Sequence, residues 1–238
     1  MMNGTGVDDL NQIYDILDDG AIEGEATAAS FLPQVNDRVE DTAQFDRFMF
    51  FYEAGIRQMT TKLQILDREF QHSNDRNPIE NIKSRLKSPE SIRSKMEKRG
   101  LPMTISSMVN NIYDIAGIRV ICPFITDVYQ IAQMLISQTD VELMQMKDYI
   151  KDPKENGYRS LHLIVKITVF FSDTAHQVPI EIQLRTIAMN FWASTEHQLR
   201  YKKDKEFTPD MHQRLKHCAE LMADADYQMQ KLAEEIHF

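Results

Sequence analysis

The residues with the clearest chemical potential are two carboxylates far apart in the chain. Residues 178–184 alternate strictly, so that Ile180 and Ile182 point to one face of a strand while Glu181 and Gln183 point to the other. A solvated strand face explains such a polar row equally well, so a catalytic role for Glu181 requires a partner. Asp114 is the candidate partner, although its position before a glycine-containing strand also suits a turn cap.

A cationic segment is the second chemical feature. Between Lys83 and Arg99 there are seven basic residues and two acidic ones. Lys95 and Lys98 are three apart and share a helix face, whereas Arg85 and Lys87 are two apart on an extended stretch. Converging cations of this kind suit a triphosphate, whose charge must be neutralised before attack. A solvated surface or a nucleic-acid patch is the more ordinary interpretation of such a segment.

A lysine-rich turn followed by an aromatic residue is the third feature. Asn156-Gly157 predicts a turn that places Tyr158 at the start of a strand, with Ser160 and His162 on the same side. An aromatic ring beside lysine and arginine can stack on a base while the cations hold its phosphates. A hairpin turn with an ordinary core tyrosine explains the same residues.

Helices must position these residues on both sides of a sheet. Apolar residues at steps of three and four predict a long amphipathic helix over 45–70, and further helices are expected from Asn77-Pro78, from Ser88-Pro89 to Gly100, over 187–201 and over 209–236. Strands are expected at 117–122, 141–147, 159–171 and 178–184, with a helix capped by Thr126 or Asp127 between the first two. The expected order is helices, a sheet with an inserted helix, then helices.

Charge and composition divide the chain into a leader and a body. Residues 1–46 contain eleven acidic residues and only Arg38 as a base, a net charge of −10, so the remaining residues carry +1 of the total of −9. We therefore expect an acidic, mobile extension over 1–40, with at most a short helix at 8–17. The body divides into a catalytic domain at 41–205 and a C-terminal helix at 206–238.

Several classes of protein are disfavoured by the same sequence. No apolar stretch approaches the roughly 20 residues that span a bilayer, and the acidic start is unlike a secretory signal. A cytoplasmic protein without membrane segments is therefore expected. Cys122 and Cys218 lack metal-ligand spacing and are interpreted as buried apolar residues, not as a disulfide or a zinc site.

Six motifs in order closely resemble the synthetase domain of the RelA/SpoT family over about residues 45–235. They are Ser-Arg-Leu-Lys-Ser at 84–88, Asp-Ile-Ala-Gly-Ile-Arg at 114–119, Lys-Asp-Tyr-Ile at 147–150, Asn-Gly-Tyr-Arg-Ser-Leu-His at 156–162, Glu-Ile-Gln-Leu-Arg-Thr at 181–186 and Asn-Phe-Trp-Ala at 190–193. The resemblance implies an α+β, nucleotidyltransferase-like fold, in which helices flank a mixed β-sheet and further helices stand at both ends. It also implies synthesis of the alarmone (p)ppGpp, by transfer of the pyrophosphate of ATP to the 3′-hydroxyl of GDP or GTP with release of AMP.

The resemblance assigns roles to these residues in two groups. Asp114 and Glu181 would hold Mg²⁺ and be the catalytic carboxylates, with Glu181 orienting or deprotonating the acceptor hydroxyl. The residues implied to bind ATP or its phosphates are Arg85, Lys87, Ser91, Lys95, Lys98 and Arg119. The residues implied to bind the acceptor are Lys154, Tyr158, Arg159, His162, Gln183 and Asn190, with the Tyr158 ring stacked on guanine.

The resemblance to a subfamily follows from one further observation. The long members carry a hydrolase domain with a His-Asp pair, and this sequence contains no His-Asp dipeptide. It therefore resembles the small, stand-alone alarmone synthetases, which typically form homotetramers through their terminal helices. The apolar residues of 209–236 would supply that contact, or would instead fold back on their own domain. Gln145 stands where the long enzymes tend to have arginine, so the choice between GDP and GTP stays open.

Three alternatives compete with synthesis. The cationic segment with Tyr158 could bind single-stranded RNA, although the near-neutral body disfavours this as the main role. Some small synthetases bind RNA or the alarmone itself as regulation, so these functions are compatible with catalysis. A catalytically inactive guanosine-nucleotide sensor and a nucleotidyltransferase that adds a nucleotide are the other two.

Overall fold

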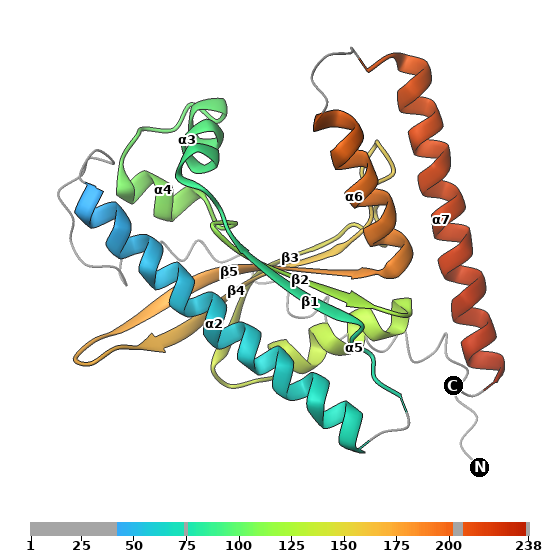
Figure 1. The fold of residues 1–238 in the computed structure, drawn as a ribbon, viewed down its shortest axis with the longest axis horizontal. Helices are drawn as coiled ribbons and strands as arrows, with labels where there is room; N and C mark the ends of the chain where they lie inside the picture. Colours follow the sequence, from blue (N-terminus) through green and yellow to red (C-terminus); the bar gives the residue numbers. More distant parts are fainter. Residues whose placement is uncertain (1–41, 74–75, 202–206, 237–238) are drawn as a thin grey trace.

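Figure 1 shows the fold in a computed structural model, which describes residues 42–73, 76–201 and 207–236. The predicted helix at 8–17 lies outside the described residues. In chain order the elements are α2 (Thr42–Ser73), β1 (Asn81–Leu86), α3 (Pro89–Lys98), α4 (Ile105–Asn111), β2 (Ala116–Cys122), α5 (Ile125–Ile136), β3 (Val141–Asp148), β4 (Leu161–Phe170), β5 (Ala175–Thr186), α6 (Ile187–Tyr201) and α7 (Pro209–Glu235).

The five strands make one mixed sheet in the order β1-β2-β5-β4-β3. Only the β2–β5 pair is parallel, and the other three pairs are antiparallel. The parallel pair joins strands separated by α5, β3 and β4, which brings the sequence around Asp114 next to the sequence around Glu181. The predicted mixed sheet flanked by helices is thereby confirmed.

The two faces of the sheet differ in chemistry because strand side chains alternate. Ile180, Ile182 and Leu184 of β5 are fully buried and belong to the main core, together with apolar residues of α2 and α5. On α2, Met59 and Leu63 are fully buried, as the apolar periodicity predicts. The opposite face of β5 carries Glu181 and Gln183, which stay half-buried. The helices on the core face leave this polar face available for a site.

The predicted helix after Asn77-Pro78 is wrong, because this segment leads into strand β1. Residues 81–86 pair antiparallel with β2, from Asn81 opposite Ile121 to Leu86 opposite Ala116. Only Ile82 of β1 is half-buried and its other residues are exposed, as is typical of an edge strand. Pairing with β2 has overridden the local helix signal. The short helix α4 is an addition that the sequence analysis did not predict, and Thr104 caps it.

Two smaller expectations also need correction. Neither Thr126 nor Asp127 is the N-cap of α5; the cap is Phe124, and the fully buried carboxylate of Asp127 accepts a hydrogen bond from the Phe124 backbone N–H at 3.1 Å. Cys122 is buried as predicted, but Cys218 is exposed on α7. None of the described helices is both long and apolar enough to cross a membrane.

The C-terminal helices α6 and α7 lie side by side at one end of the sheet (Figure 1). The indole N–H of Trp192 on α6 donates to the Leu215 carbonyl on α7 at 2.9 Å. The buried stripe of α7 consists of Leu215, Ala219, Asp226, Gln230 and Ala233. The larger apolar residues of the helix stay exposed, namely Met211, Leu221, Met229 and Leu232.

Candidate active site

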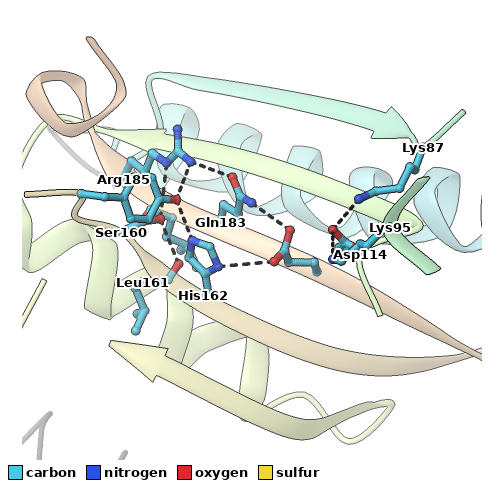
Figure 2. A network of polar contacts seen from close by, with 11 residues as sticks. Lys87, Lys95, Asp114, Ser160, Leu161, His162, Gln183 and Arg185 are labelled. Atoms are coloured by element: carbon cyan, nitrogen blue, oxygen red, sulfur yellow. Dashed lines mark hydrogen bonds and ion pairs between the residues drawn. The ribbon is translucent and has the colours of Figure 1, made fainter. Parts of the chain in front are cut away.

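Asp114 lies between α4 and β2 and is held by two lysines from neighbouring elements. Its Oδ2 accepts from Lys87 Nζ and from Lys95 Nζ, each at 2.6 Å (Figure 2). Lys87 follows β1, whereas Lys95 stands in the last turns of α3, whose N-terminus is capped by Ser88. The sheet and α3 therefore meet at one carboxylate.

The electrostatics of Asp114 keep it ionised. Burial raises the pKa of the carboxyl, but the hydrogen bonds and charges of Lys87 and Lys95 outweigh burial, so the pKa is lower than usual. The second oxygen, Oδ1, is buried without a hydrogen-bond partner among the described residues. An anionic carboxylate with one oxygen free is suited to a hard cation such as Mg²⁺.

Glu181 stands on β5 directly beside Gly117 of β2 in the parallel register. Its Oε2 accepts from the Gln183 side-chain amide at 2.8 Å, and its Oε1 lies 3.3 Å from Nδ1 of His162 on β4. Burial raises the pKa of Glu181, yet the contacts with His162 and Gln183 prevail and leave it lower than usual. The carboxylate is therefore charged and oriented by two neighbours.

Asp114 lies near enough to Glu181 for its negative charge to raise the pKa of Glu181, against the stronger effects of His162 and Gln183. A cavity of about 210 Å³ lies over the polar face of β1, β2 and β5. Its lining residues are Lys83, Ser84, Arg85, Gly117, Ile118, Arg119, Glu181 and Gln183. A Cβ at Gly117 would lie 3.5 Å from the Arg85 side chain, which is an ordinary van der Waals contact.

Arginines make the cavity strongly cationic. Burial, together with the charges of Arg185 and Arg85, lowers the pKa of Arg119. The Nε of Arg119 is buried without a hydrogen-bond partner among the described residues. Mutually repelling guanidinium groups with an unused donor are arranged for a polyanion such as a triphosphate.

Aromatic and cationic side chains gather at the β4 end of the same face. The Tyr158 hydroxyl lies 2.8 Å from Nε2 of His162, and their rings are arranged edge-on. The Lys154 ammonium is 5.1 Å from the centroid of the Tyr158 ring and 4.5 Å from that of Tyr149. The predicted acceptor residues Lys154, Tyr158 and His162 are thus brought together, and His162 connects them to Glu181.

Four predicted site residues lie outside this set of contacts. Arg159 donates to the Ala219 carbonyl of α7 at 3.3 Å. The Asn190 side chain accepts from Ser194 within α6 at 3.5 Å. Ser91 bonds the cap residue Ser88, and Lys98 is exposed at the end of α3.

Two residues of the site were not given a role by the sequence analysis. Lys83 lines the cavity, and Arg185 is only 4% exposed yet donates to both Tyr158 and Gln183. The signal for Arg185 was available, because it continues the polar alternation of Glu181 and Gln183 along the same strand.

Comparison with known proteins agrees with this geometry. Residues 84–206 match the family described as "Region found in RelA / SpoT proteins". The chain belongs to the RelA/SpoT family. It is 40% identical over 188 residues to the GTP pyrophosphokinase YwaC of Bacillus subtilis, covering 79% of this chain and 90% of that protein. It is 32% identical over 196 residues to the GTP pyrophosphokinase YjbM of Bacillus subtilis, covering 82% of this chain and 92% of that protein.

Solved structures of small alarmone synthetases share the fold. Small alarmone synthetase 1 of Bacillus subtilis, bound to its product pppGpp, superposes with a TM-score of 0.76 at 32% identity, covering 82% of this chain and 99% of that one. Small alarmone synthetase 2 of the same organism gives a TM-score of 0.73 at 38% identity, covering 80% and 98%. The RelA/SpoT chain described here is therefore similar to small synthetases along nearly their whole length.

Proposed function

We propose that this RelA/SpoT chain synthesises (p)ppGpp by moving the β,γ-pyrophosphate of ATP to the 3′-hydroxyl of GDP or GTP. The observation that carries the proposal is Glu181 in the lining of a cationic cavity, with the lysine-held Asp114 near enough to raise its pKa and with His162 in contact with it. The names of the relatives, GTP pyrophosphokinases, and the pppGpp bound to one similar structure support the same reaction.

The reaction needs positioning and charge neutralisation rather than a protein nucleophile. The acceptor 3′-oxygen forms a bond to the β-phosphorus, the bond from that phosphorus to the α,β-bridging oxygen breaks, and AMP leaves with that oxygen. Glu181 takes or orients the proton of the attacking hydroxyl. Lys87, Lys95, Arg85 and Arg119 are the groups that would neutralise the transferred phosphates.

Asp114 and Glu181 are also the residues that would hold Mg²⁺. Among the described residues there is no cluster of three or more His, Cys, Asp or Glu side chains that could hold a metal on its own. Two carboxylates fit Mg²⁺, which keeps several waters and is usually completed by substrate phosphates. When bound, the ion would supply further neutralisation of the triphosphate charge.

The test follows the two ends of ATP separately. The protein is incubated with Mg²⁺, GDP or GTP, and ATP labelled at either the γ- or the α-phosphorus. We expect the γ-label in guanosine tetra- or pentaphosphate and the α-label in AMP in equal amounts, with no product from a folded Glu181→Gln variant. An α-label in the guanosine product would show nucleotidyl transfer, and label remaining only in ATP would show a nucleotide or RNA binder; either result overturns the proposal.

We also propose that the chain forms a homotetramer. Exposed apolar side chains on the outer surface of α7, among them Leu221, Met229 and Leu232, support an interface there. Light scattering should give about four times the 27.7 kDa chain mass, and a monomeric mass would contradict the proposal. A cytoplasmic location and regulatory binding of an alarmone or of single-stranded RNA stay predictions.

A further inference from the structure

A closed ring of hydrogen bonds surrounds the acceptor end of the site (Figure 2). Arg185 Nη2 donates to the Tyr158 hydroxyl at 2.6 Å and to Gln183 Oε1 at 2.8 Å. Tyr158 meets His162 Nε2 at 2.8 Å, and both His162 and Gln183 contact Glu181. The ring therefore runs from Arg185 to Glu181 along two separate branches.

The directions of these bonds follow from chemistry, since a guanidinium can only donate and a carboxylate can only accept. On one branch, Gln183 must present its oxygen to Arg185 and its NH₂ to Glu181. On the other, the Tyr158 oxygen accepts from Arg185, and Nδ1 of His162 must carry a proton because it faces the acceptor-only Glu181. In the neutral imidazole Nε2 then has no proton, so it accepts the hydroxyl proton of Tyr158.

We propose that Arg185 is a positioning residue for the acceptor half of the reaction: it orients Gln183 and, through Tyr158, fixes the Nδ1–H tautomer of His162, so that two donors hold Glu181. The proposal rests on the function proposed above, since it assigns Glu181 to the attacking hydroxyl. It also links the ring of Tyr158, which would carry the acceptor base, to the carboxylate that would receive the acceptor proton.

The burial of Arg185 supports this role. Its side chain is 4% exposed, and Nε donates to the fully buried Ser160 hydroxyl at 3.4 Å, which in turn donates to the Leu184 carbonyl at 3.1 Å. These contacts fix the guanidinium plane, so that the two N–H groups of one nitrogen diverge towards Tyr158 and Gln183. A lysine ammonium would keep the charge but lose this fixed geometry.

The first test is the tautomer itself, measured in the ligand-free protein. Nitrogen-15 spectra of histidine-labelled protein at pH 8, with His162 assigned from a His162→Asn variant, should show a protonated Nδ1 and an unprotonated Nε2. In Tyr158→Phe, which keeps the aromatic ring but removes the relay hydroxyl, the Nδ1–H form should lose its dominance. A wild-type His162 protonated at Nε2 would overturn the proposal, whether or not the protein makes alarmone.

The second test is kinetic and uses Arg185→Lys beside Arg57→Lys, a matched change in an exposed surface ion pair. We expect Arg185→Lys to lower kcat about 100-fold, raise the KM for the acceptor and leave the KM for ATP unchanged, with Arg57→Lys like wild type. Equal increases in both KM values, or an unchanged kcat, would refute the positioning role.

Folding of the variants is checked so that neither test is ambiguous. Tyr158→Phe removes one oxygen and should fold even if Arg185→Lys does not, and it should show the same direction of change in kcat. A folded Tyr158→Phe with wild-type kcat and the wild-type tautomer of His162 would overturn the proposal. If wild type makes no labelled product, the proposed function fails. The tautomer measurement then still tests the proposed role of Arg185 in fixing His162.

Discussion

Replacing Asp114 by asparagine should damage folding and activity through separate causes. In the wild type one oxygen of Asp114 accepts from Lys87 and from Lys95, whose side chains are 13% and 29% exposed. Asparagine keeps the size of the side chain but removes its charge, so two neighbouring ammonium groups lose their common partner. Activity should fall because the triphosphate site loses one of its two carboxylates.

The magnitude of the stability loss follows from these contacts. Removing one partner of a buried ion pair costs about 3–5 kcal/mol, and partial exposure of both lysines favours the lower end, about 3 kcal/mol. Because the folded-state pKa of Asp114 is lowered, this contribution is present above its unfolded pKa and is lost as pH falls through the folded value. The difference between wild type and variant should therefore be full at pH 7 and should shrink below about pH 4.

The assay is urea unfolding followed by the fluorescence of Trp192, the single tryptophan, which is buried against α7. Asp140→Asn is the matched control, because Asp140 pairs with Lys62 in a half-exposed bridge and should cost less than about 1 kcal/mol. Adding Lys87→Met to Asp114→Asn should recover stability by removing an unpaired charge, yet should not recover activity.

Turnover of Asp114→Asn should fall by about 10³-fold, on the scale of a lost group in transition-state stabilisation. Two results would refute the reasoning. One is a variant as stable as wild type at pH 7, which would mean that the lysines find equal partners without the carboxylate. The other is turnover within tenfold of wild type, which would remove Asp114 from the reaction.

Two further predictions concern contacts of α7, one with Gly157 and one with Thr186. Gly157→Ala should destabilise the protein by about 2 kcal/mol in urea unfolding and raise the acceptor KM. The reason is that φ at Gly157 is +89° and a Cβ there would lie 2.6 Å from the Ala219 Cβ. Unchanged stability would contradict this close approach. Burial raises the pKa of Asp226 to about 6, against a hydrogen bond from Thr186 at 2.6 Å. Because of the raised pKa, the wild type loses stability as pH rises from about 4 to 6. Asp226→Asn still accepts the bond from Thr186, so the variant should be more stable than wild type by about 1–3 kcal/mol at pH 7 but little different at pH 4. A variant that is less stable than wild type at both pH values would contradict this prediction.

The periodicity of apolar residues was sufficient to predict an element wherever one face of that element is buried in the core. The strict alternation around Glu181 predicted both the strand β5 and the orientation of its polar row, and residues 187–201 form the expected helix. The failure at Asn77-Pro78 has the opposite cause. Strand β1 is an exposed edge whose backbone bonds go to β2, so its own side chains carry little of the signal that fixes it.

Strand parity is informative inside a regular strand and gives no guidance outside it. Along β5, Glu181, Gln183 and Arg185 lie on one face, so alternation alone selects Arg185. Tyr158 and Arg159 precede β4, where alternation does not apply, and the structure shows that Tyr158 contacts His162 whereas Arg159 contacts Ala219 of α7.

The two carboxylates are kept ionised by different means, and this difference divides the site. Asp114 is balanced by two full positive charges, whereas Glu181 is held by the amide of Gln183 and by His162. Phosphates entering on the Asp114 side would compete for Lys87 and Lys95, and the arrival of ATP would therefore release that carboxylate for a cation. We expect no such exchange at Glu181, because its neighbours Gln183 and His162 stand on strands of the sheet and the buried Arg185 holds Gln183. In the proposed reaction the ATP half would therefore reorganise on binding while the acceptor half stays fixed, as in-line attack by a positioned hydroxyl requires.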